Sequence, residues 1–290
     1  TKNGDMIVTL NLAWMGGGKS PVRWRGWMLK ITPEGKMTPI ATGLRSPAGF
    51  GINAEGDYFY TENQGDWVGS GRMTHLEVGD FAGHPEGLKW SGDPLSPLTL
   101  KPEDIVDNSG LTLYEYSKKE KAVKAPAIWF PHTILGISTS DILYDTTEGK
   151  FGPFEGQQFV GDQGHSKIMR VYMEKVNGVY QGAAFPFREG FSSGILRMIW
   201  GSDNSMFVGM TSRGWASTGK KEYGLQRLEW TGKTPFEIKT MKAQNDGFEL
   251  EFTKPINKEE AEDLSNYSMA TFNYSYHKKY GSPIIDQQKA

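Results

Sequence analysis

Apolar and polar residues alternate along many short stretches of this chain, with the two-residue period that is typical of β-strands. Two stretches, 48–67 and 196–215, align without a gap as AGFGINAEGDYFYTENQGDW and LRMIWGSDNSMFVGMTSRGW. Each runs from a strand through a turn of acidic, glycine or asparagine residues into a second strand. A polar loop that ends in tryptophan follows. The pattern predicts two equivalent β-hairpins.

A third, looser copy lies between these two in the sequence. Residues 137–145 resemble the first strand, and 146–156 resemble an expanded turn. Residues 157–174 then supply a second strand, a polar loop and a third strand. The repeat therefore recurs at least three times, which indicates an architecture built from similar units.

Outer strands can be assigned to the same units. Residues 27–44 predict a hairpin around PEGK, 167–187 a hairpin around VNGV, and 223–230 a single strand. Antiparallel units of about four strands that follow one another are the signature of β-propeller blades. We therefore expect an all-β protein with about four blades in residues 1–232. A closed ring usually has about 4–8 blades and the first unit lacks its opening strand, so the chain is expected to be part of a larger ring.

Two segments depart from the repeat. Residues 68–126 are rich in proline and charge and predict a long excursion over one face, with a short helix near 101–107. Residues 233–290 alternate at strand spacing around NDGF (245–248) and include a polar helix at 257–264. We expect this tail to form a small β-sandwich-like module.

Composition narrows the function classes. The formal net charge is -2, so the chain offers no basic surface that would attract nucleic acid. It has no cysteine, which excludes disulfides, thiolate metal sites and a haem attachment motif within it. No apolar run approaches the roughly 20 residues of a membrane-spanning helix.

Repeat symmetry predicts where a functional site would lie. The loops that follow Phe59, Phe159 and Phe207 are equivalent, and loops at one end of propeller blades form the pocket. Their polar side chains are therefore predicted to face one shared site, and the set includes Glu62, Asn63, Gln64, Asp66, Asp162, Gln163, His165 and Arg213.

The side-chain types indicate possible roles. Glu62 and Asp162 are oxygen donors of the kind that calcium prefers. Arg197 and Arg213 are suited to hold a carboxylated cofactor or an anionic substrate. The competing interpretation is that these residues only form turns, as acidic and amide side chains in such loops usually do.

Histidines offer a general base. His165 belongs to the third repeat, and His132, in WFPHTILGIS, precedes an inner strand. Either could accept a proton from a substrate hydroxyl. His84, in GDFAGHPEG, lies in the excursion and is placed to cap the pocket.

Several of these stretches resemble the glucose/sorbosone dehydrogenase-like propellers. More closely, they are similar to a bacterial group of large secreted proteins described as membrane-bound dehydrogenases, some with a c-type haem domain. The matching stretches are LRSPAGFGINAEGDYFYTENQGDW, APAIWFPHTILGISTSDI, GKFGPFEGQQFVGDQGHSKIMRV and FREGFSSGILRMIW.

The resemblance implies a six-bladed quinoprotein-like fold and a periplasmic or secreted location. It also implies pyrroloquinoline quinone (PQQ) and calcium as cofactors, and a c-type cytochrome as electron acceptor. In such enzymes a histidine takes the hydroxyl proton while hydride goes to the quinone. Arginine and amide side chains hold the quinone, and Asn63, Gln64 and Gln163 are amides of this kind here.

The resulting hypothesis is a quinone-dependent dehydrogenase that oxidises a hydroxyl of a small sugar or polyol. One alternative is a non-catalytic propeller that binds a carbohydrate or a protein, without redox turnover. The other is a calcium-dependent lactonase or hydrolase, which would need no quinone.

Overall fold

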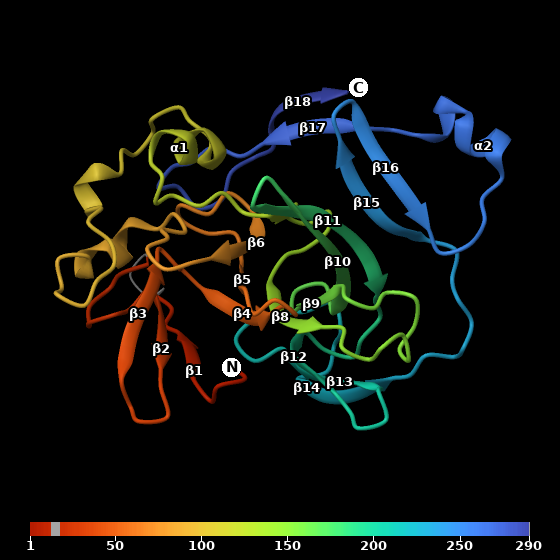
Figure 1. The fold of residues 1–290 in the computed structure, drawn as a ribbon, viewed down its shortest axis with the longest axis horizontal. Helices are drawn as coiled ribbons and strands as arrows, with labels where there is room; N and C mark the ends of the chain where they lie inside the picture. The colour runs from red at the N-terminus through yellow and green to blue at the C-terminus, as the bar shows by residue number, and fades with distance from the viewer. Residues whose placement is uncertain (13–17, 290) are drawn as a thin grey trace. The chain divides into compact units, whose positions relative to one another are not determined.

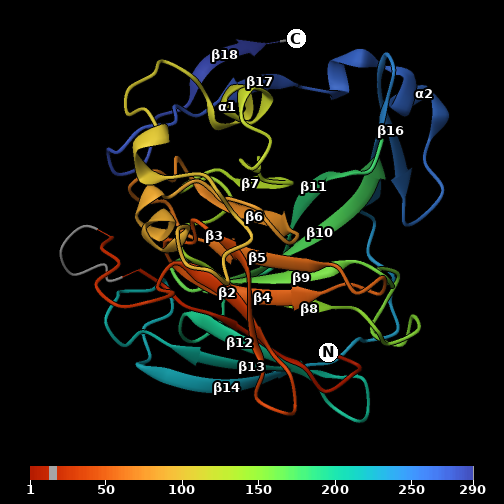
Figure 2. The ribbon, with the colours of Figure 1, turned by 60° about the vertical axis from the view of Figure 1, so that its left-hand side comes forward.

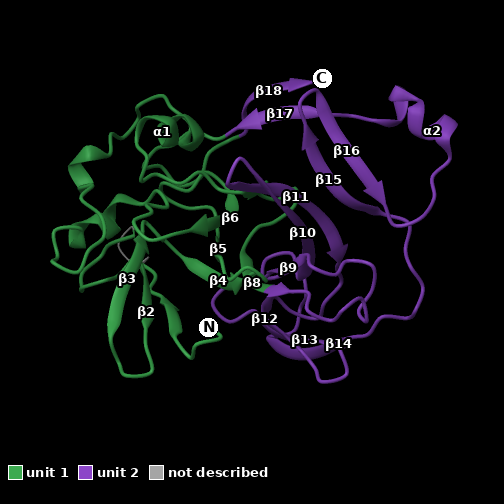
Figure 3. Ribbon diagram, in the orientation of Figure 1, with its two compact units in different colours: residues 1–142, 274–283 green, residues 143–273, 284–290 purple. Residues whose placement is uncertain are grey.

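A computed structural model describes residues 1–12 and 18–289, which fold mainly as antiparallel β-strands (Figure 1). Contacts divide the chain into two compact units, residues 1–142 with 274–283 (unit 1) and residues 143–273 with 284–290 (unit 2) (Figure 3). Antiparallel sheets of three or four strands follow one another along the chain. This confirms the predicted all-β class with propeller blades.

The sheets of unit 1 are meanders in which each strand pairs with its neighbour in the sequence. One has the order β1-β2-β3 and the other the order β4-β5-β6-β7. As predicted, the first lacks a fourth strand among the described residues. The strands are β1 (Met6–Thr9), β2 (Trp27–Ile31), β3 (Met37–Thr42), β4 (Pro47–Ile52), β5 (Tyr58–Glu62), β6 (Gly71–Leu76) and β7 (Ile128–Phe130).

Two further sheets follow. One has the order β11-β10-β9-β8, with the unit boundary inside β8, and the other has the order β12-β13-β14. The strands are β8 (Thr139–Tyr144), β9 (Gln158–Asp162), β10 (Lys167–Val176), β11 (Val179–Arg188), β12 (Ile195–Trp200), β13 (Met206–Thr211) and β14 (Tyr223–Leu228).

The two aligned repeats do form equivalent hairpins. β4 pairs with β5 and β12 pairs with β13, both antiparallel. Gly56 and Asn204 occupy the same position of the repeat, and both have a left-handed backbone, with φ of 93° and 63°. Glycine and asparagine adopt this conformation most readily. The residue types at the turns therefore determine where both hairpins form.

The excursion between β6 and β7 is a packed layer. β6 lies within the predicted range 68–126, so the irregular part begins only after Leu76. The helix expected near 101–107 is a single 3-10 turn. A longer helix follows it, begun by a capping box between Thr112 and Glu115. The helical elements are η1 (Pro85–Trp90), η2 (Pro102–Asp104) and α1 (Leu113–Lys119).

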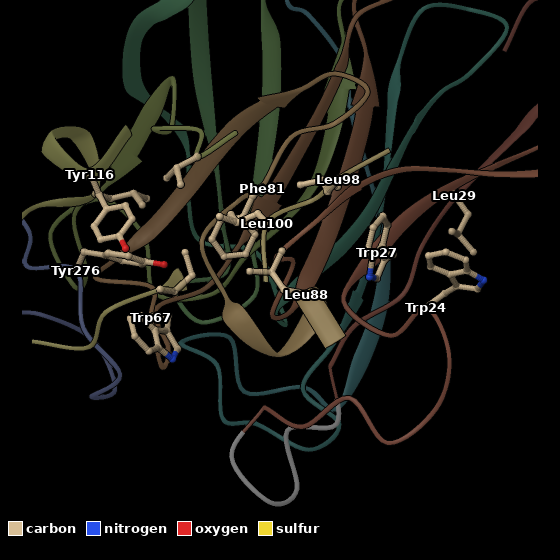
Figure 4. Close-up of a cluster of buried hydrophobic side chains, with 13 residues drawn as sticks. Trp24, Trp27, Leu29, Trp67, Phe81, Leu88, Leu98, Leu100, Tyr116 and Tyr276 are labelled. Atoms are coloured by element: carbon tan, nitrogen blue, oxygen red, sulfur yellow. The ribbon is translucent and has the colours of Figure 1, made fainter. Parts of the chain in front are cut away.

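A hydrophobic core fixes this layer in unit 1 (Figure 4). Phe81 is 0% exposed and Leu88 is 1% exposed. The Trp27 indole is also buried, and its Nε1 donates to the Gly87 carbonyl at 2.7 Å. The Tyr276 hydroxyl donates to the Gly83 carbonyl at 2.5 Å. Because its apolar side chains are buried and its backbone is bonded, the excursion is an integral part of unit 1.

The tail does not form one separate body. It contains two two-stranded sheets, β15-β16 and β17-β18, and its turn and helix lie where the sequence predicted them. Residues 274–283 belong to unit 1, where Tyr274 contacts Trp129 at 4.9 Å between ring centroids. The boundary at residue 232 stays a prediction. The elements are β15 (Ile238–Gln244), β16 (Gly247–Phe252), α2 (Lys258–Glu262), η3 (Leu264–Asn266), β17 (Ala270–Asn273) and β18 (Ile285–Lys289).

Arg170 joins β15 to the sheet of β9, β10 and β11. Its side chain is 1% exposed, and its guanidinium lies over the rings of Phe154 and Phe185 at 4.0 and 4.4 Å from their centroids. It donates to the carbonyls of Ile238 at 2.6 Å and Lys239 at 2.9 Å. Burial lowers the pKa of Arg170 to about 10, which leaves the guanidinium charged at neutral pH.

We expect Arg170→Met to release β15. Each buried carbonyl that loses its donor costs about 1–3 kcal/mol, so the free energy of unfolding should fall by at least that amount. Urea unfolding measures this loss, and limited proteolysis should cut faster between β14 and β15. The control is Arg188→Met, because Arg188 is 48% exposed and should change stability by less than about 0.5 kcal/mol. Equal effects of the two substitutions would contradict the role given to Arg170.

Candidate functional site

Glu62 ends β5 inside a buried ion pair. Glu62 and Arg72 are both 0% exposed and are opposite each other in the β5–β6 register. Glu62 Oε1 accepts from Arg72 Nε at 2.8 Å and from the Tyr60 hydroxyl at 2.9 Å. Oε2 accepts the backbone N–H groups of Arg45 at 3.0 Å and Ser46 at 3.2 Å. Both oxygens are thus bonded to protein donors, a role that differs from the predicted calcium ligand.

Glu62 and Arg72 can both be buried because their opposite charges compensate each other. Burial alone would lower the pKa of Arg72, but the Glu62 carboxylate beside it raises that pKa above its usual range. A buried pair is costly when one partner is lost. Glu62 therefore fixes the start of the polar loop that follows β5, and the chain at residues 45–46.

Asp66 lies in that loop at the centre of a second polar cluster. Its Oδ2 is 2.6 Å from His84 Nε2, and Arg45 Nε donates to its Oδ1. His84 Nδ1 accepts the Glu86 N–H at 3.3 Å. Because Nδ1 accepts, the proton of the neutral ring lies on Nε2 and is donated to Asp66. Both ring nitrogens are therefore occupied, and His84 positions the loop instead of serving as a base.

The pKa of Asp66 follows from this arrangement. Burial would raise it, but hydrogen bonds from His84 and Arg45, together with the positive charge of Arg45, outweigh burial and hold the pKa well below its usual range. The sequence placed Asp66 in the polar loop and His84 near the pocket. It gave no signal that Arg45, at the start of the preceding strand, would join them.

The remaining predicted residues of unit 1 lie in the loops after β5 and β7. Gln64 Nε2 donates to the Gly69 carbonyl at 3.2 Å. Asn63 Oδ1 is buried without a hydrogen-bond partner among the described residues. The backbone N–H of His132 donates to Ser70 Oγ at 2.9 Å. The Ser70 hydroxyl thus ties the loop after β7 to the loop after β5.

In unit 2, the loop after β9 contains three of the predicted residues. Asp162 is 0% exposed, and its Oδ1 accepts the backbone N–H of His165 at 2.6 Å. Gln163 Nε2 donates to the Thr211 carbonyl at 3.4 Å. The Nδ1 atom of His165 is buried and has no hydrogen-bond partner in the described part of the chain. Asp162 shapes the turn, and one ring nitrogen of His165 has no partner in the described part of the chain.

The structure brings this loop and the loop after β13 together, as repeat symmetry predicted. Thr218 N–H donates to the Gly164 carbonyl, and Gly219 N–H donates to Ser166 Oγ, both at 2.9 Å. The loop after β13 forms a cavity of about 520 Å³. It is lined by Ser212, Gly214, Trp215, Ala216, Ser217, Gly219 and Lys220. The sequence analysis ended this site at Trp215 and missed the small residues and the lysine beyond it.

Equivalent tryptophans have different environments in the two repeats. Trp67 is 8% exposed and contacts the Tyr276 ring at 5.0 Å between centroids. Trp215 is 61% exposed and lines the cavity. An exposed indole beside a cavity offers a flat apolar face to a ligand.

Both predicted arginines of unit 2 are exposed. Arg213 lies between two residues that line the cavity, and its N–H donates to Thr211 Oγ1 at 3.1 Å. Arg197 is on β12, and its Nη1 donates to the Leu196 carbonyl at 2.8 Å. Among residues 1–12 and 18–289, no three or more His, Cys, Asp or Glu side chains gather to hold a metal ion. Calcium binding by Glu62 and Asp162 stays a prediction.

Comparison with known proteins shows which solved structures have a similar fold. A scan against models of protein families and a search of the curated proteins find no match. Among solved structures, the chain is similar to an oxidoreductase of Thermus thermophilus described as a glucose dehydrogenase. The TM-score is 0.52 at 16% identity, over 77% of this chain and 61% of that chain. This likeness confirms the predicted sugar dehydrogenase-like propeller fold.

Two further structures match less well. The PQQ-bound aldose sugar dehydrogenase of Streptomyces coelicolor has a TM-score of 0.46 at 14% identity, over 71% of this chain and 52% of that chain. The PQQ domain of pyranose dehydrogenase from Coprinopsis cinerea has a TM-score of 0.39 at 12% identity, over 77% and 67%. The chain spans about three fifths of the length of the Thermus protein. In the described residues, no helix is both long and apolar enough to cross a membrane.

The lowered pKa of Asp66 predicts how stability depends on pH. The stabilisation by the ionised carboxylate is complete above the unfolded-state pKa of about 3.9 and is lost as the pH falls toward the lower folded-state value. Urea midpoints of the wild type should fall steeply below about pH 4. Asp66→Asn should be less stable at neutral pH, with a shallower decline in acid.

Glu55→Gln is the control for this measurement, because Glu55 is an exposed turn residue. It should keep both the neutral stability and the steep acid decline of the wild type. Parallel pH curves for Asp66→Asn and the wild type would contradict the account of the Asp66 cluster.

Proposed function

We propose that this chain belongs to a quinone-dependent dehydrogenase that oxidises a hydroxyl group of a small sugar or polyol. The observation that supports it most is the meeting of two repeat loops in unit 2. One loop contains His165, and the other contains Arg213 and the cavity-lining Trp215. The fold likeness to the Thermus protein makes a redox function the first to test. A periplasmic or secreted location and a c-type cytochrome as electron acceptor belong to the same proposal.

His165 is the proposed base. A neutral imidazole accepts a proton through its unprotonated nitrogen, and His165 Nδ1 is a buried ring nitrogen with no hydrogen-bond partner among the described residues; in the proposal this nitrogen is the unprotonated one. A substrate hydroxyl that reached it would supply the missing hydrogen bond. His132 is the other candidate from the sequence, and it lies in unit 1.

The residues around the cavity fit a flat, carboxylated quinone. The exposed face of Trp215 offers a stacking surface, and Lys220 lines the same cavity. Arg213, next in sequence to the lining residue Ser212, adds a second cation. Arginine and lysine are the side chains that bind carboxylates. Arg213, Lys220 and Trp215 would hold PQQ, and Gln163 would orient the adjoining loop.

In the proposed reaction the alcohol loses two hydrogens, one as a hydride and one as a proton, and each goes to a different acceptor. When bound, the quinone supplies an acceptor for the hydride, with its electron pair, that leaves the hydroxyl-bearing carbon. The hydroxyl proton passes to His165 Nδ1, and the carbon–oxygen bond becomes a carbonyl. The protein's contribution is to position the alcohol, accept this proton and exclude water.

One observation favours a second function. Trp215 is 61% exposed, and an indole face beside serine hydroxyls suits a sugar ring as well as a quinone. The chain could then be a carbohydrate-binding propeller without redox turnover. The predicted lactonase has less support, because Glu62 uses both carboxylate oxygens within the protein.

Reconstitution with PQQ separates these functions. The dehydrogenase predicts that PQQ quenches tryptophan fluorescence and raises the melting temperature, and that aldoses or polyols then reduce a dye. His165→Gln should lower kcat by about 10²–10⁴-fold with PQQ binding retained. His132→Gln is the matched control and should change kcat by less than about threefold, because proton transfer would not pass through it.

The other outcomes decide against the proposal. Sugar binding by calorimetry without dye reduction would establish the carbohydrate-binding function instead. A lower kcat in His132→Gln, with kcat unchanged in His165→Gln, would identify His132 of unit 1 as the base instead. No PQQ binding and no dye reduction with any aldose or polyol would exclude the dehydrogenase.

A further inference from the structure

The last blade sheet of unit 2 ends in an exposed edge strand. The sheets β4-β5-β6-β7 and β11-β10-β9-β8 have four strands, whereas β12-β13-β14 has three. β14 pairs with β13 along one side, and no strand of the described residues pairs with its other side (Figure 2). A fourth strand would therefore find a free row of backbone donors and acceptors there.

The side chains of β14 also favour pairing. Tyr223 is 76% exposed and Leu225 is 70% exposed. Natural edge strands usually avoid association through short length, inward charges, proline or bulges. β14 has no proline, and its register with β13 is regular from Tyr223 to Leu228. An edge that is regular, apolar and uncovered is suited to receive another strand.

The sequence of this edge is complementary to itself. If two copies of KKEYGLQRLEW (220–230) lie antiparallel with Leu225 opposite the partner's Leu225, then Tyr223 is opposite the partner's Arg227. Lys221 is then opposite the partner's Glu229. Directly opposite side chains are about 4.5–5.5 Å apart at Cβ, close enough for an ion pair and for a cation over a ring.

We propose that two copies of this chain associate through β14, as an antiparallel pair about a two-fold axis centred on Leu225. Such an interface is isologous, so every favourable pair occurs twice. Arg227 and Glu229 are already at the edge, 45% and 60% exposed, and contact each other at 2.6 Å. The partner's Tyr223 would add a further contact to Arg227, and the partner's Lys221 would add a further contact to Glu229. This interface adjoins the proposed catalytic cavity, which Lys220 lines, but the pairing does not depend on the chemistry of that cavity.

A single introduced cysteine tests the register. The chain has no cysteine, so Leu225→Cys has only one possible partner, the same position in a second copy. Opposite residues of an antiparallel pair have Cα atoms about 4.5–5.5 Å apart, within the range that a disulfide spans. Mild oxidation should convert most of this variant to a covalent dimer at micromolar concentration.

The matched control is Ile134→Cys. Ile134 is 68% exposed, nearly the same as Leu225, but it lies in a loop of unit 1. It should remain monomeric on a denaturing gel. Equal cross-linking at the two positions, or none at Leu225→Cys, would overturn the proposal.

Charge reversal tests the interface without cross-linking. By sedimentation of the full chain, Lys221→Glu and Glu229→Lys should each raise the dimer dissociation constant about tenfold, because like charges would face each other in both symmetric pairs. The double variant restores opposite charges and should recover the wild-type constant. A monomeric wild type at all concentrations, or a double variant weaker than either single one, would overturn the proposal.

Discussion

The buried ion pair of Glu62 and Arg72 is the constraint on which the site of unit 1 depends. Charges removed from water must be compensated, and here the tyrosine hydroxyl of β5 and two backbone N–H groups complete the shell of the carboxylate. Together with Arg72 of β6, these donors come from segments on both sides of β5. The need to satisfy one carboxylate therefore sets the path of the chain before β4 and after β5, and brings Arg45 within reach of Asp66.

Local turn chemistry made much of the fold predictable. Gly56 and Asn204 take the left-handed conformation that a tight hairpin needs, and alternating apolar residues mark the strands on either side. These signals lie within a few residues of one another, so a single sequence is enough to interpret them. The packing of Tyr274 against Trp129 and the anchoring of β15 by Arg170 depend on residues far apart in the chain. No local pattern contains that information.

The candidate site was predictable to a smaller extent. Repeat symmetry correctly placed the loops after β9 and β13 together, because equivalent strands end at equivalent places. It could not show that the Glu62 carboxylate pairs with Arg72, because a carboxylate that faces an arginine and one that faces a metal ion have the same local sequence pattern. It also treated Trp67 and Trp215 alike. Trp67 is covered by Tyr276 from the tail, whereas Trp215 lines a cavity. Equivalent positions of two repeats can therefore have different roles although their backbones are alike.

The hydrogen bond from Tyr276 to Gly83 spans 193 residues of sequence. At roughly 5–20 residues per second, a ribosome takes about 10–40 s to make the stretch between these two residues. During that interval Trp67 and Trp129 lack the tyrosines that cover them. The nascent chain therefore exposes part of its aromatic core during synthesis, and transiently exposed apolar surface of this kind promotes aggregation.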